Sequence, residues 1–561
     1  MATQKPLQAL AVIPARGGSK GIPRKNIREL HGKPLLWYTV TAALESGCFE
    51  DVVVSTDHDE IAHIAEESGA LVHRRAADLA GDEVTLDAVI YDAVQGKGRQ
   101  YEVVATLQPT APLLRAETLR KAFDHIRDNP HIDTLISVVN DPRLSWIEQE
   151  GRIVPNYTAR VNRQYLPPLY RETGAFFLSR TRCVTPTSRF GNEVAVFEIS
   201  PEEAIDIDTM QDWWIVEKYL ERRRIAIRVD GSRPIGFGHI YRMLLLANRM
   251  LDHQVHFFLD ESQEEAVSMI RNAFYPHTAT PRGELISQLI THQPDIVILD
   301  ILDTSAEEVM QLREKGIFVV SFEDLGAGMA HTHLTINALY ESTIPYLHVH
   351  SGQDYYCLRE EFTHTSPITI KEKVDHLVIT FGGSDPTNQT LRCVRALADF
   401  LPECATRVTL ILGLGYPAEA EEELRRFLES SPLSGWVTIK RHVLSMASEF
   451  KAADLVITSC GRTMYEIASL GVPAILIAQN RREMQHTFGH SENGFANLGL
   501  GTELSDEVLL RTVRELCEQW ELRREMQHRM LSTDFRNGLD RVYRLIMDTY
   551  WKTTGRNRKR G

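Results

Sequence analysis

The sequence predicts an α/β protein made of three successive series of parallel strands and helices. Short apolar runs alternate with segments of helical character along most of the chain, which is the rhythm of βαβ units. The charged run Glu221-Arg-Arg-Arg224 interrupts this rhythm, and a fresh strand pattern opens directly after it. At 561 residues, the chain is also too long for one hydrophobic core.

The first series predicts a largely parallel sheet, with any nucleotide bound at the carboxyl ends of the strands. Residues 141–200 lose the rhythm and carry prolines and aromatics, so we interpret them as a substrate cap that could also form a dimer contact. We expect strands at 10–13, 52–55, 103–107 and 135–139, and helices at 35–46, 60–68, 116–127 and near 209–221.

Two further series follow, and two doubly wound halves in tandem, with a cleft between them, predict a GT-B-like architecture. The first half has expected strands at 225–230, 255–259, 296–299 and 317–320. The second half has them at 377–380, 408–412, 437–439, 455–457 and 474–477. We therefore divide the chain into a Rossmann-like domain (1–222), two GT-B-like halves (225–365 and 370–535), and a C-terminal helix with a basic tail (536–561).

Composition excludes several classes of function. A hydrophobic content of 43% with 25% charged residues is typical of a soluble globular protein. The net charge of −14 argues against general nucleic-acid binding. No apolar stretch reaches the ~20 residues of a membrane span, and the start lacks the apolar core of a signal peptide. Seven cysteines without a Cys-x-x-Cys motif favour reduced thiols in a cytoplasm.

A glycine-rich loop predicts a phosphate site in the first domain. The loop Ile13-Pro-Ala-Arg-Gly-Gly-Ser-Lys-Gly-Ile-Pro-Arg-Lys-Asn26 follows an expected strand and carries the cations Arg16, Lys20, Arg24 and Lys25. Backbone amides freed by glycines, together with these cations, suit a polyanion such as a nucleoside triphosphate. The loop is no Walker A motif, because no Gly-Lys-Ser/Thr closes it.

A pair of acidic residues predicts a metal site for the same nucleotide. Asp206 and Asp208 stand two apart in the run Ile205-Asp-Ile-Asp-Thr209, which we expect to be a strand. Residues i and i+2 of a strand point to one face, so the two carboxylates can share Mg²⁺ (or Mn²⁺) that also contacts phosphate oxygens. A phosphate cradle beside a metal pair predicts nucleotidyl transfer.

The segment from Ile13 to Leu36 resembles the signature of the cytidylyltransferases that activate nonulosonic (sialic-type) acids as CMP-sugars. The runs Leu107-Gln-Pro-Thr-Ala-Pro112, Tyr170-Arg-Glu-Thr-Gly-Ala-Phe176 and Ile205-Asp-Ile-Asp-Thr209 follow in family order, and the resemblance covers about 8–222. It implies a GT-A-like nucleotidyltransferase domain with CTP and a nonulosonic acid as substrates, and a homodimer formed through this domain.

The cations of the loop are expected to spread the charge that develops on the phosphates, with Arg16 and Lys25 as catalytic residues. Asn26 would hold the ribose or base. The resemblance implies that Arg74 or Arg75 approaches the cytosine with Asp82, and that Gln108 and Arg171 approach the sugar acid. The expected CTP-binding set is Ala15, Arg16, Gly17, Ser19, Lys20, Lys25, Asn26, Arg74, Arg75 and Asp82.

A second glycine-rich turn opens the GT-B-like part, in Val229-Asp-Gly-Ser-Arg-Pro-Ile-Gly-Phe-Gly-His239-Ile-Tyr-Arg242. It fails the Gly-x-Gly-x-x-Gly pattern, because Tyr241 replaces the third glycine. His239 falls in the first turn of the next expected helix, whose dipole disfavours a cationic imidazole, so the ring can accept a proton. A capping or packing role is the alternative for a lone histidine.

This part resembles the UDP-sugar hydrolases of pseudaminic acid biosynthesis over about 225–500. The opening just quoted carries the likeness, together with Ser321-Phe-Glu-Asp324, Ile336-Asn-Ala338, Leu358-Arg-Glu-Glu-Phe362, Phe381-Gly-Gly-Ser-Asp385 and the stretch 458–466. The resemblance implies that His239 is the base or the group that orients water.

The glycine turn after residue 380 can approach a diphosphate, and Glu466 suits the ribose hydroxyls. Asp230 could orient the imidazole or bind substrate, Glu323 and Asp324 could be a turn, and the stretch after Gln479 has no assigned role. The expected UDP-sugar-binding set is Asp230, Gly238, Arg242, Gly382, Gly383, Ser384, Ser459, Gly461 and Glu466.

Together these signals predict a bifunctional enzyme of CMP-nonulosonate biosynthesis. It would hydrolyse a UDP-2,4-diacetamido-2,4,6-trideoxyhexose and would also make the CMP-sugar, with a separate phosphoenolpyruvate-condensing synthase as its pathway partner. Two alternatives remain for the GT-B-like part: a glycosyltransferase that passes the sugar to an acceptor, and a non-catalytic UDP-sugar-binding module. Pseudaminic, legionaminic and sialic acids are not distinguished.

Overall fold

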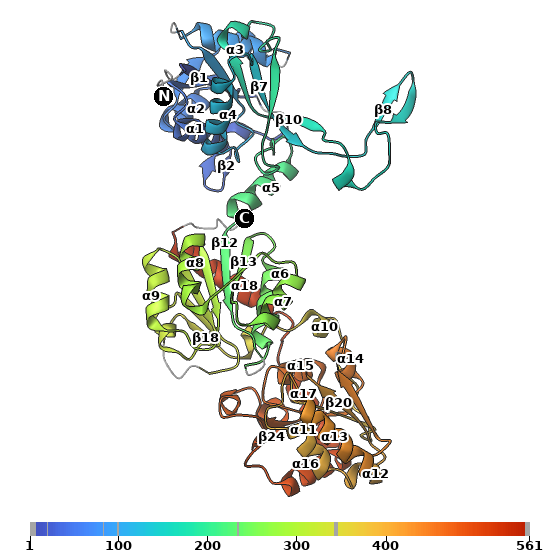
Figure 1. Ribbon diagram of the computed structural model, residues 1–561. Helices are drawn as coiled ribbons and strands as arrows, with labels where there is room; N and C mark the ends of the chain where they lie inside the picture. Colours follow the sequence, from blue (N-terminus) through green and yellow to red (C-terminus); the bar gives the residue numbers. More distant parts are fainter. Residues whose placement is uncertain are drawn as a thin grey trace. The chain divides into compact units, whose positions relative to one another are not determined.

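The computed structural model describes residues 7–18, 21–81, 83–97, 100–232, 235–341, 346–413, 415–441 and 443–555. The chain forms two compact units, with the boundary between Arg222 and Arg223. Each unit is built from parallel strands with helices packed on them (Figure 1), which confirms the predicted α/β class. None of the described helices is long and apolar enough to cross a membrane.

The described residues of the first unit form one large sheet in the order β11-β7-β10-β6-β1-β4-β5. All neighbouring pairs are parallel except those of β10, which runs antiparallel between β7 and β6. The strands are β1 (Ala9–Pro14), β4 (Asp51–Thr56), β5 (Leu71–Arg74), β6 (Val103–Leu107), β7 (Thr134–Asn140), β10 (Tyr170–Arg180) and β11 (Val194–Glu198).

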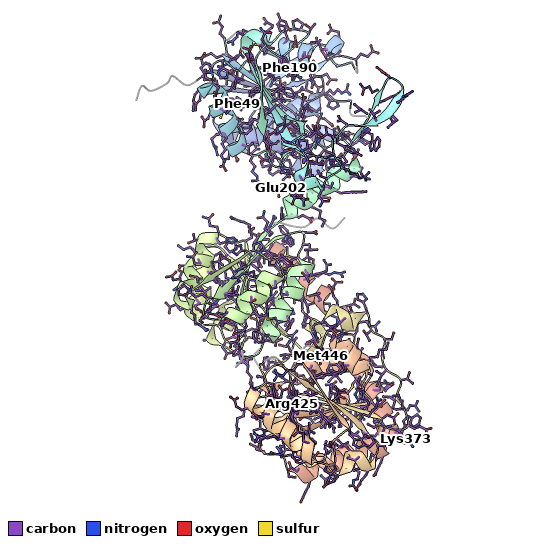
Figure 2. All side chains as sticks on the ribbon, turned by 45° about the vertical axis from the view of Figure 1, so that its right-hand side comes forward. Phe49, Phe190, Glu202, Lys373, Arg425 and Met446 are labelled. Carbon is purple, nitrogen blue, oxygen red and sulfur yellow. The ribbon has the colours of Figure 1, made fainter. Side chains whose placement is uncertain are left out.

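Helices cover both faces of this sheet. One core joins α1, α2 and α4 to the residues of β1 that point to one face, and a second core joins α3 to Leu10 and Val12 on the other face. Phe49, labelled in Figure 2, packs edge-on against Phe123 of α4 with ring centroids 6.0 Å apart. The helices are α1 (Leu35–Ser46), α2 (Asp59–Glu67), α3 (Leu86–Gln95), α4 (Ala116–Asp128) and α5 (Met210–Glu221).

The interpretation of residues 141–200 as a cap is wrong for part of that stretch. Strands β8 (Trp146–Gln149) and β9 (Arg152–Pro155) do pair as a hairpin away from the main sheet, on the arm seen in Figure 1. In contrast, β10 and β11 belong to the main sheet. Only the second half of β10 is continuously buried, while Tyr170, Arg171 and Glu172 are exposed, so its sequence begins like a loop.

The second unit contains two doubly wound sheets, in the orders β14-β13-β12-β15-β16-β17-β18 and β21-β20-β19-β22-β23-β24, and all neighbouring strands are parallel. This is the GT-B-like pair predicted from the sequence. The first sheet consists of β12 (Arg224–Val229), β13 (Gln254–Asp260), β14 (His277–Thr280), β15 (Ile296–Asp300), β16 (Phe318–Phe322), β17 (Leu334–Asn337) and β18 (Val349–Ser351).

The second sheet consists of β19 (His376–Thr380), β20 (Arg407–Leu412), β21 (Val437–Arg441), β22 (Leu455–Thr458), β23 (Ala474–Ala478) and β24 (Phe495–Leu500). The helices of the unit, in chain order, are α6 (Gly238–Arg249), α7 (Glu264–Asn272), α8 (Leu285–His292), α9 (Ala306–Glu314), α10 (Glu360–Thr363), α11 (Gln389–Ala396), α12 (Phe400–Glu403), α13 (Ala418–Ser430), α14 (Met446–Lys451), α15 (Thr463–Leu470), α16 (Asp506–Glu518), α17 (Trp520–Met530) and α18 (Gly538–Thr553).

The C-terminal helix α18 returns to the first sheet of this unit. Val542 and Ile546 of α18 share a core with Ile225 and Ile227 of β12. The chain therefore passes between the two halves twice. The two passages lie against each other at Gly538, where a β-carbon would lie 2.0 Å from the carbonyl oxygen of Tyr356.

Candidate active sites

The loop after β1 in the first unit is held closely against the end of β4. The buried Ala15 donates its N–H to the carbonyl of Ser55 at 3.0 Å, and Gly17 donates its N–H to Asp57 Oδ1 at 3.0 Å. A β-carbon on Gly17 would lie 2.7 Å from the His58 ring, so a larger residue there would have to displace that ring. Predicted residues Ser19 and Lys20 lie outside the described residues.

The far side of the loop is closed by a buried amide. Asn26 is 6% exposed, and its Nδ2 donates to the carbonyl oxygen of Arg16 at 3.0 Å. This bond fixes the two ends of the loop relative to each other, so Asn26 shapes the loop in addition to the nucleotide contact expected of it. Arg24 adopts the left-handed conformation (φ 56°) that turns the chain into the short helix of residues Lys25–Ile27.

The structure separates the two adjacent arginines that the sequence left undecided. Arg75 is buried at the end of β4, where its Nη2 donates to the carbonyl of Ser55 at 2.8 Å, and burial lowers the pKa of its guanidinium. Arg74 is exposed and pairs with Asp59 at 2.8 Å. Arg75 is therefore the arginine that faces the loop side of the sheet. Asp82 lies outside the described residues.

The acidic run is extended but forms no strand, so that prediction is wrong. Residues 205–208 have no strand neighbour beyond one bond from the Ile207 N–H to the carbonyl of Thr110 (2.8 Å), and the capping box at Thr209 begins α5 directly afterwards. The alternation nevertheless persists, because Ile207 is fully buried while Asp208 is exposed.

Lys25 ties this run to the loop after β1. Its Nζ donates to the carbonyl of Ile207 at 2.6 Å and pairs with Asp208 Oδ1 at 3.2 Å. Asp206 has a buried Oδ1 with no hydrogen-bond partner among the described residues, and burial, with the charge of Asp208, raises its pKa.

The two aspartates fit a divalent cation as far as the described residues reach. An unpartnered buried carboxylate oxygen beside an exposed carboxylate is a hard, anionic donor set of the kind that Mg²⁺ prefers. No third acidic, histidine or cysteine side chain joins them in the described ranges, so the remaining ligands would be water and substrate phosphates.

Gln108 converges on the same place. A β-carbon on Gly174 of β10, where φ is +71°, would lie 2.9 Å from Gln108 Nε2 and 3.5 Å from Asp206 Oδ2. The glycine thus lets the amide and the carboxylate both approach the backbone of β10 closely. Arg171 lies three residues earlier at the base of the arm, exposed and with its Nε 3.9 Å from Asp141 Oδ2.

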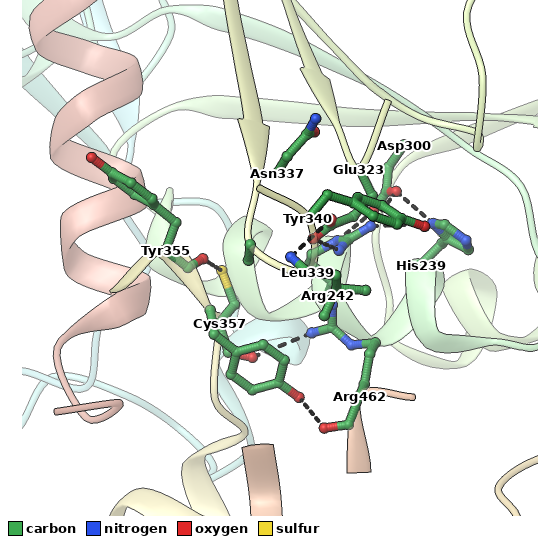
Figure 3. Close-up of polar contacts among 12 residues, drawn as sticks. His239, Arg242, Asp300, Glu323, Asn337, Leu339, Tyr340, Tyr355, Cys357 and Arg462 are labelled. Carbon is green, nitrogen blue, oxygen red and sulfur yellow. Dashed lines mark hydrogen bonds and ion pairs between the residues drawn. The ribbon is translucent and has the colours of Figure 1, made fainter. Parts of the chain in front are cut away.

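In the second unit, His239 belongs to a network of buried charges (Figure 3). Its Nδ1 lies 2.5 Å from Asp300 Oδ1, at the end of β15. Arg242, one turn along α6, donates to both oxygens of Asp300, with Nε at 2.8 Å from Oδ2 and Nη2 at 2.5 Å from Oδ1. Its Nη1 donates to Glu323 Oε1 at 2.8 Å.

The carboxylate of Asp300 favours the tautomer of the imidazole that carries its proton on Nδ1, although Arg242 Nη2 also lies 3.2 Å from that nitrogen. Burial alone would raise the pKa of Asp300, but the charges of Arg242 and His239 outweigh it and hold that pKa well below its usual range. Asp300 is then an anion that accepts a hydrogen bond from the Nδ1–H of His239. In a neutral ring this leaves Nε2 as the proton acceptor.

Asp300 was missed by the sequence reading, which placed Asp230 near the imidazole. Asp230 is buried and pairs instead with Arg282 at 3.5 Å, and burial raises its pKa. The signal for Asp300 was present, because an aspartate ends the buried strand β15, and β15 is the direct neighbour of β12 in a parallel sheet.

Glu323 and Asp324, which the sequence suggested could be a turn, have different roles in the structure. Asp324 is a turn residue whose oxygens accept from the N–H and hydroxyl of Thr304 at 3.0 and 2.6 Å. Glu323 holds Arg242 and accepts the N–H of Leu339 at 3.2 Å.

The predicted turns of the second half lie at the carboxyl ends of β19 and β22. No atom comes within 4 Å of a β-carbon on Gly382 or Gly383, so both backbones are open to a ligand. Ser384 follows them, and Ser459 and Gly461 precede α15. On α15, Glu466 accepts from Arg359 Nε at 2.8 Å, which places a cation beside the expected ribose ligand.

Two arginines of the second half, also missed, reach the first half. Arg482 lies in the stretch that had no assigned role, and it donates to the Tyr340 hydroxyl at 2.8 Å and to Asp303 at 3.1 Å. Arg462 donates to the carbonyl of Cys357 at 3.4 Å. No hydrophobic pattern marks such contacts, because they join residues more than 100 positions apart in the chain.

Comparisons with known proteins match this geometry. A largely parallel sheet with a glycine loop and an acidic pair is the arrangement expected of a nucleotidyltransferase domain, and the cytidylyltransferase family model matches residues 10–150. The chain is 34% identical over 233 residues to the CMP-N,N'-diacetyllegionaminic acid synthase of Legionella pneumophila, a match covering 39% of this chain and 100% of that protein. The chain therefore belongs to the cytidylyltransferase family.

Two further relatives match the same part of the chain. The pseudaminic acid cytidylyltransferase of Campylobacter jejuni is 32% identical over 218 residues, covering 37% of this chain and 93% of that protein. The N-acylneuraminate cytidylyltransferase A of Danio rerio is 34% identical over 220 residues, or 38% of this chain, and the match spans about half (50%) of that relative's length. Residues 377–542 match the glycosyltransferase family 28 C-terminal domain.

Proposed function

We propose that the protein is a bifunctional enzyme of CMP-nonulosonate biosynthesis. The first unit transfers CMP from CTP to a nonulosonic acid and releases pyrophosphate. The second unit hydrolyses a UDP-2,4-diacetamido-2,4,6-trideoxyhexose to UDP and the free sugar. Two observations support the first activity: the family membership, and the convergence of Lys25, Asp206 and Gln108 at one end of the sheet.

In the first reaction, the anomeric hydroxyl of the sugar acid attacks the α-phosphorus of CTP in line with the departing pyrophosphate. Arg16 and Lys25 stabilise the charge that develops on the phosphate oxygens. Gln108, which packs against Gly174 close to Asp206, receives the sugar acid beside them. A divalent cation held by Asp206 and Asp208 would supply charge neutralisation for the triphosphate.

The test offers CTP with N,N'-diacetyllegionaminic, pseudaminic and N-acetylneuraminic acid in turn and identifies products by mass spectrometry. These acids are named by the activities of the relatives that match the first unit. A CMP-sugar from at least one acid supports the proposal. Pyrophosphate release from none of them, with the protein folded, would count against it.

The second reaction rests on the His239–Asp300 pair. Asp300 orients the imidazole, and Nε2 takes the proton of a water molecule that attacks the anomeric carbon. His239→Ala is expected to bind UDP yet lose hydrolysis. Undiminished release of UDP by this variant would refute the assignment.

A glycosyltransferase is the second candidate for this unit. It is favoured by the match of residues 377–542 to a glycosyltransferase domain. The same His239–Asp300 pair could deprotonate an acceptor hydroxyl in place of water. Release of UDP that requires an added acceptor, and that water alone does not support, would decide for the transferase.

The two proposed activities leave a gap between them. The freed sugar must be condensed with phosphoenolpyruvate before CTP can activate it, so we infer a separate synthase as pathway partner. The arm of the first unit supports the proposed homodimer, because Trp146, Ile153 and Tyr165 are 56%, 66% and 73% exposed. Such apolar exposure is typical of an interaction surface.

A further inference from the structure

One partly buried cation in the second unit keeps a buried nitrogen without a hydrogen-bond partner among the described residues. Arg462 stands at the N-cap of α15, in the turn that follows β22. Its Nη1 is buried and has no hydrogen-bond partner among the described residues, and its Nη2 makes one long bond of 3.4 Å to the carbonyl of Cys357. A guanidinium carries five N–H donors, and leaving them unpaired away from water is costly.

The position of this cation is fixed by contacts with the first half. The Arg462 guanidinium stacks over the Tyr356 ring at 4.8 Å, and the Tyr356 hydroxyl donates to the Arg462 carbonyl at 3.0 Å. A β-carbon on Gly238 would lie 3.0 Å from Arg462 Cδ, so the arginine passes directly beside the residue before His239. Figure 3 shows its guanidinium pointing toward the Arg242 cluster.

The anions already present nearby are engaged elsewhere. Asp300 and Glu323 are bound by Arg242, although the Arg462 charge still lowers the pKa of Glu323 against the larger effect of burial. An anionic ligand is therefore the partner that this buried donor lacks. The only anionic groups of a UDP-sugar are its two phosphates, and the one next to the sugar must lie beside His239.

We propose that Arg462 is a catalytic residue that binds the sugar-linked phosphate of the nucleoside diphosphate, an inference that rests on the proposed use of a UDP-sugar. When the bond between the anomeric carbon and the phosphate oxygen breaks, both electrons go to that oxygen. The water oxygen bonds to the carbon, and its proton goes to Nε2 of His239. The charge gained by the departing UDP falls on the phosphate that Arg462 holds.

The test compares UDP with UMP, because only UDP has the second phosphate. Isothermal titration calorimetry would measure the affinity of the full chain for each nucleotide, with CTP saturating the first unit and no divalent cation present. Arg462→Gln is expected to reduce the preference for UDP over UMP by about 10- to 100-fold, the range for hydrogen bonds to a charged group. Arg462→Lys keeps a point charge but not the planar guanidinium, so its preference for UDP over UMP should fall less, by about 5- to 10-fold.

Arg395→Gln is the matched control. Arg395 lies on α11, is half exposed and pairs with Glu423 at 2.8 Å, so its loss should leave the UDP preference unchanged. A wild-type preference in Arg462→Gln, or equal losses for UDP and UMP, would overturn the inference. If Arg462→Gln fails to fold, an unchanged preference in Arg462→Lys overturns it as well.

This test separates the inference from the proposed hydrolysis. The UDP preference does not depend on whether water or another acceptor receives the sugar. Acceptor-dependent turnover would refute hydrolysis and leave the role of Arg462 intact. A wild-type chain that binds UDP and UMP equally would refute the role of Arg462 alone, and one that binds neither would refute both.

Discussion

Replacing Asp300 by asparagine tests the proposed chemistry of the second unit most directly. The amide has nearly the same shape, but it removes the anion that orients the Nδ1 proton of His239 at 2.5 Å. General base catalysis by a positioned side chain contributes about 10²- to 10⁴-fold, so we expect a loss in kcat of that size. The KM for the UDP-sugar should change little, because Asp300 is fully buried behind the imidazole.

The same substitution has a calculable cost in stability. Removing one partner of a buried ion pair costs roughly 3–5 kcal/mol, and Arg242 keeps Glu323, so we expect about 3 kcal/mol. The second unit spans Arg223–Arg558, and at about 2.1 cal/mol/K of unfolding entropy per residue this cost corresponds to a fall in Tm of about 4 °C. Steady-state UDP release and thermal denaturation, measured on the same samples, separate the two effects.

The stability difference between wild type and Asp300→Asn should depend on pH with a defined sign. The pKa of Asp300 is lowered in the folded state, so its contribution is present above the unfolded pKa of about 3.9 and is lost as the pH falls further. The difference is therefore constant at neutral pH and shrinks only in acid.

Asp324→Asn is the matched control for Asp300→Asn, since Asp324 is an equally buried carboxylate that serves only a turn. It should lower Tm without the loss in kcat. Wild-type turnover by Asp300→Asn would refute the orienting role.

Four further outcomes are expected. Asp208→Asn should abolish pyrophosphate release without changing Tm, because its side chain is 75% exposed. Gly174→Ala should raise the KM for the sugar acid and cost about 1–2 kcal/mol, since φ is +71° and the new carbon would lie 2.9 Å from Gln108 Nε2. Burial raises the pKa of Glu483 to about 7, so the folded protein keeps a proton there that the unfolded chain releases. The free energy of unfolding of wild type should therefore fall by up to about 3 kcal/mol relative to Glu483→Gln as the pH rises from about 4 to about 7, which denaturant titrations would measure. EDTA should stop CMP transfer and spare UDP release, because Asp300 and Glu323 are already paired with Arg242 and do not need a metal ion as partner. CMP-sugar formation that survives EDTA would remove the metal assignment.

The strands of the parallel sheets could be predicted because they are covered on both faces. Strands β1 and β15 are continuous apolar runs, and such runs stand out in a sequence. The central antiparallel strand β10 could not be predicted in this way. It starts with the exposed Tyr170, Arg171 and Glu172 and is continuously buried only from Ala175 onward.

The sequence located the candidate sites but not the pairing within them. The glycine turns follow strands, so their place at the strand ends follows from topology alone. Whether Arg74 or Arg75 faces inward depends on where β5 ends, because neighbouring strand residues point to opposite faces. Asp300 and Arg462 come from other strands and turns than His239, and only the assembled sheets bring them to α6.

The two sites handle charge in opposite ways, and this difference accounts for which partners each still lacks. In the first unit, Asp206 keeps a buried oxygen without a partner and Asp208 stays exposed, so the site has unbalanced negative charge that a cation can relieve. In the second unit, one guanidinium pairs with two buried carboxylates, and burial raises the pKa of one of them, Glu323, while the Arg462 guanidinium keeps a buried donor without a partner among the described residues. Buried charges are stable only when compensated. This difference supports the proposed metal with its triphosphate at the first site and the proposed diphosphate at the second.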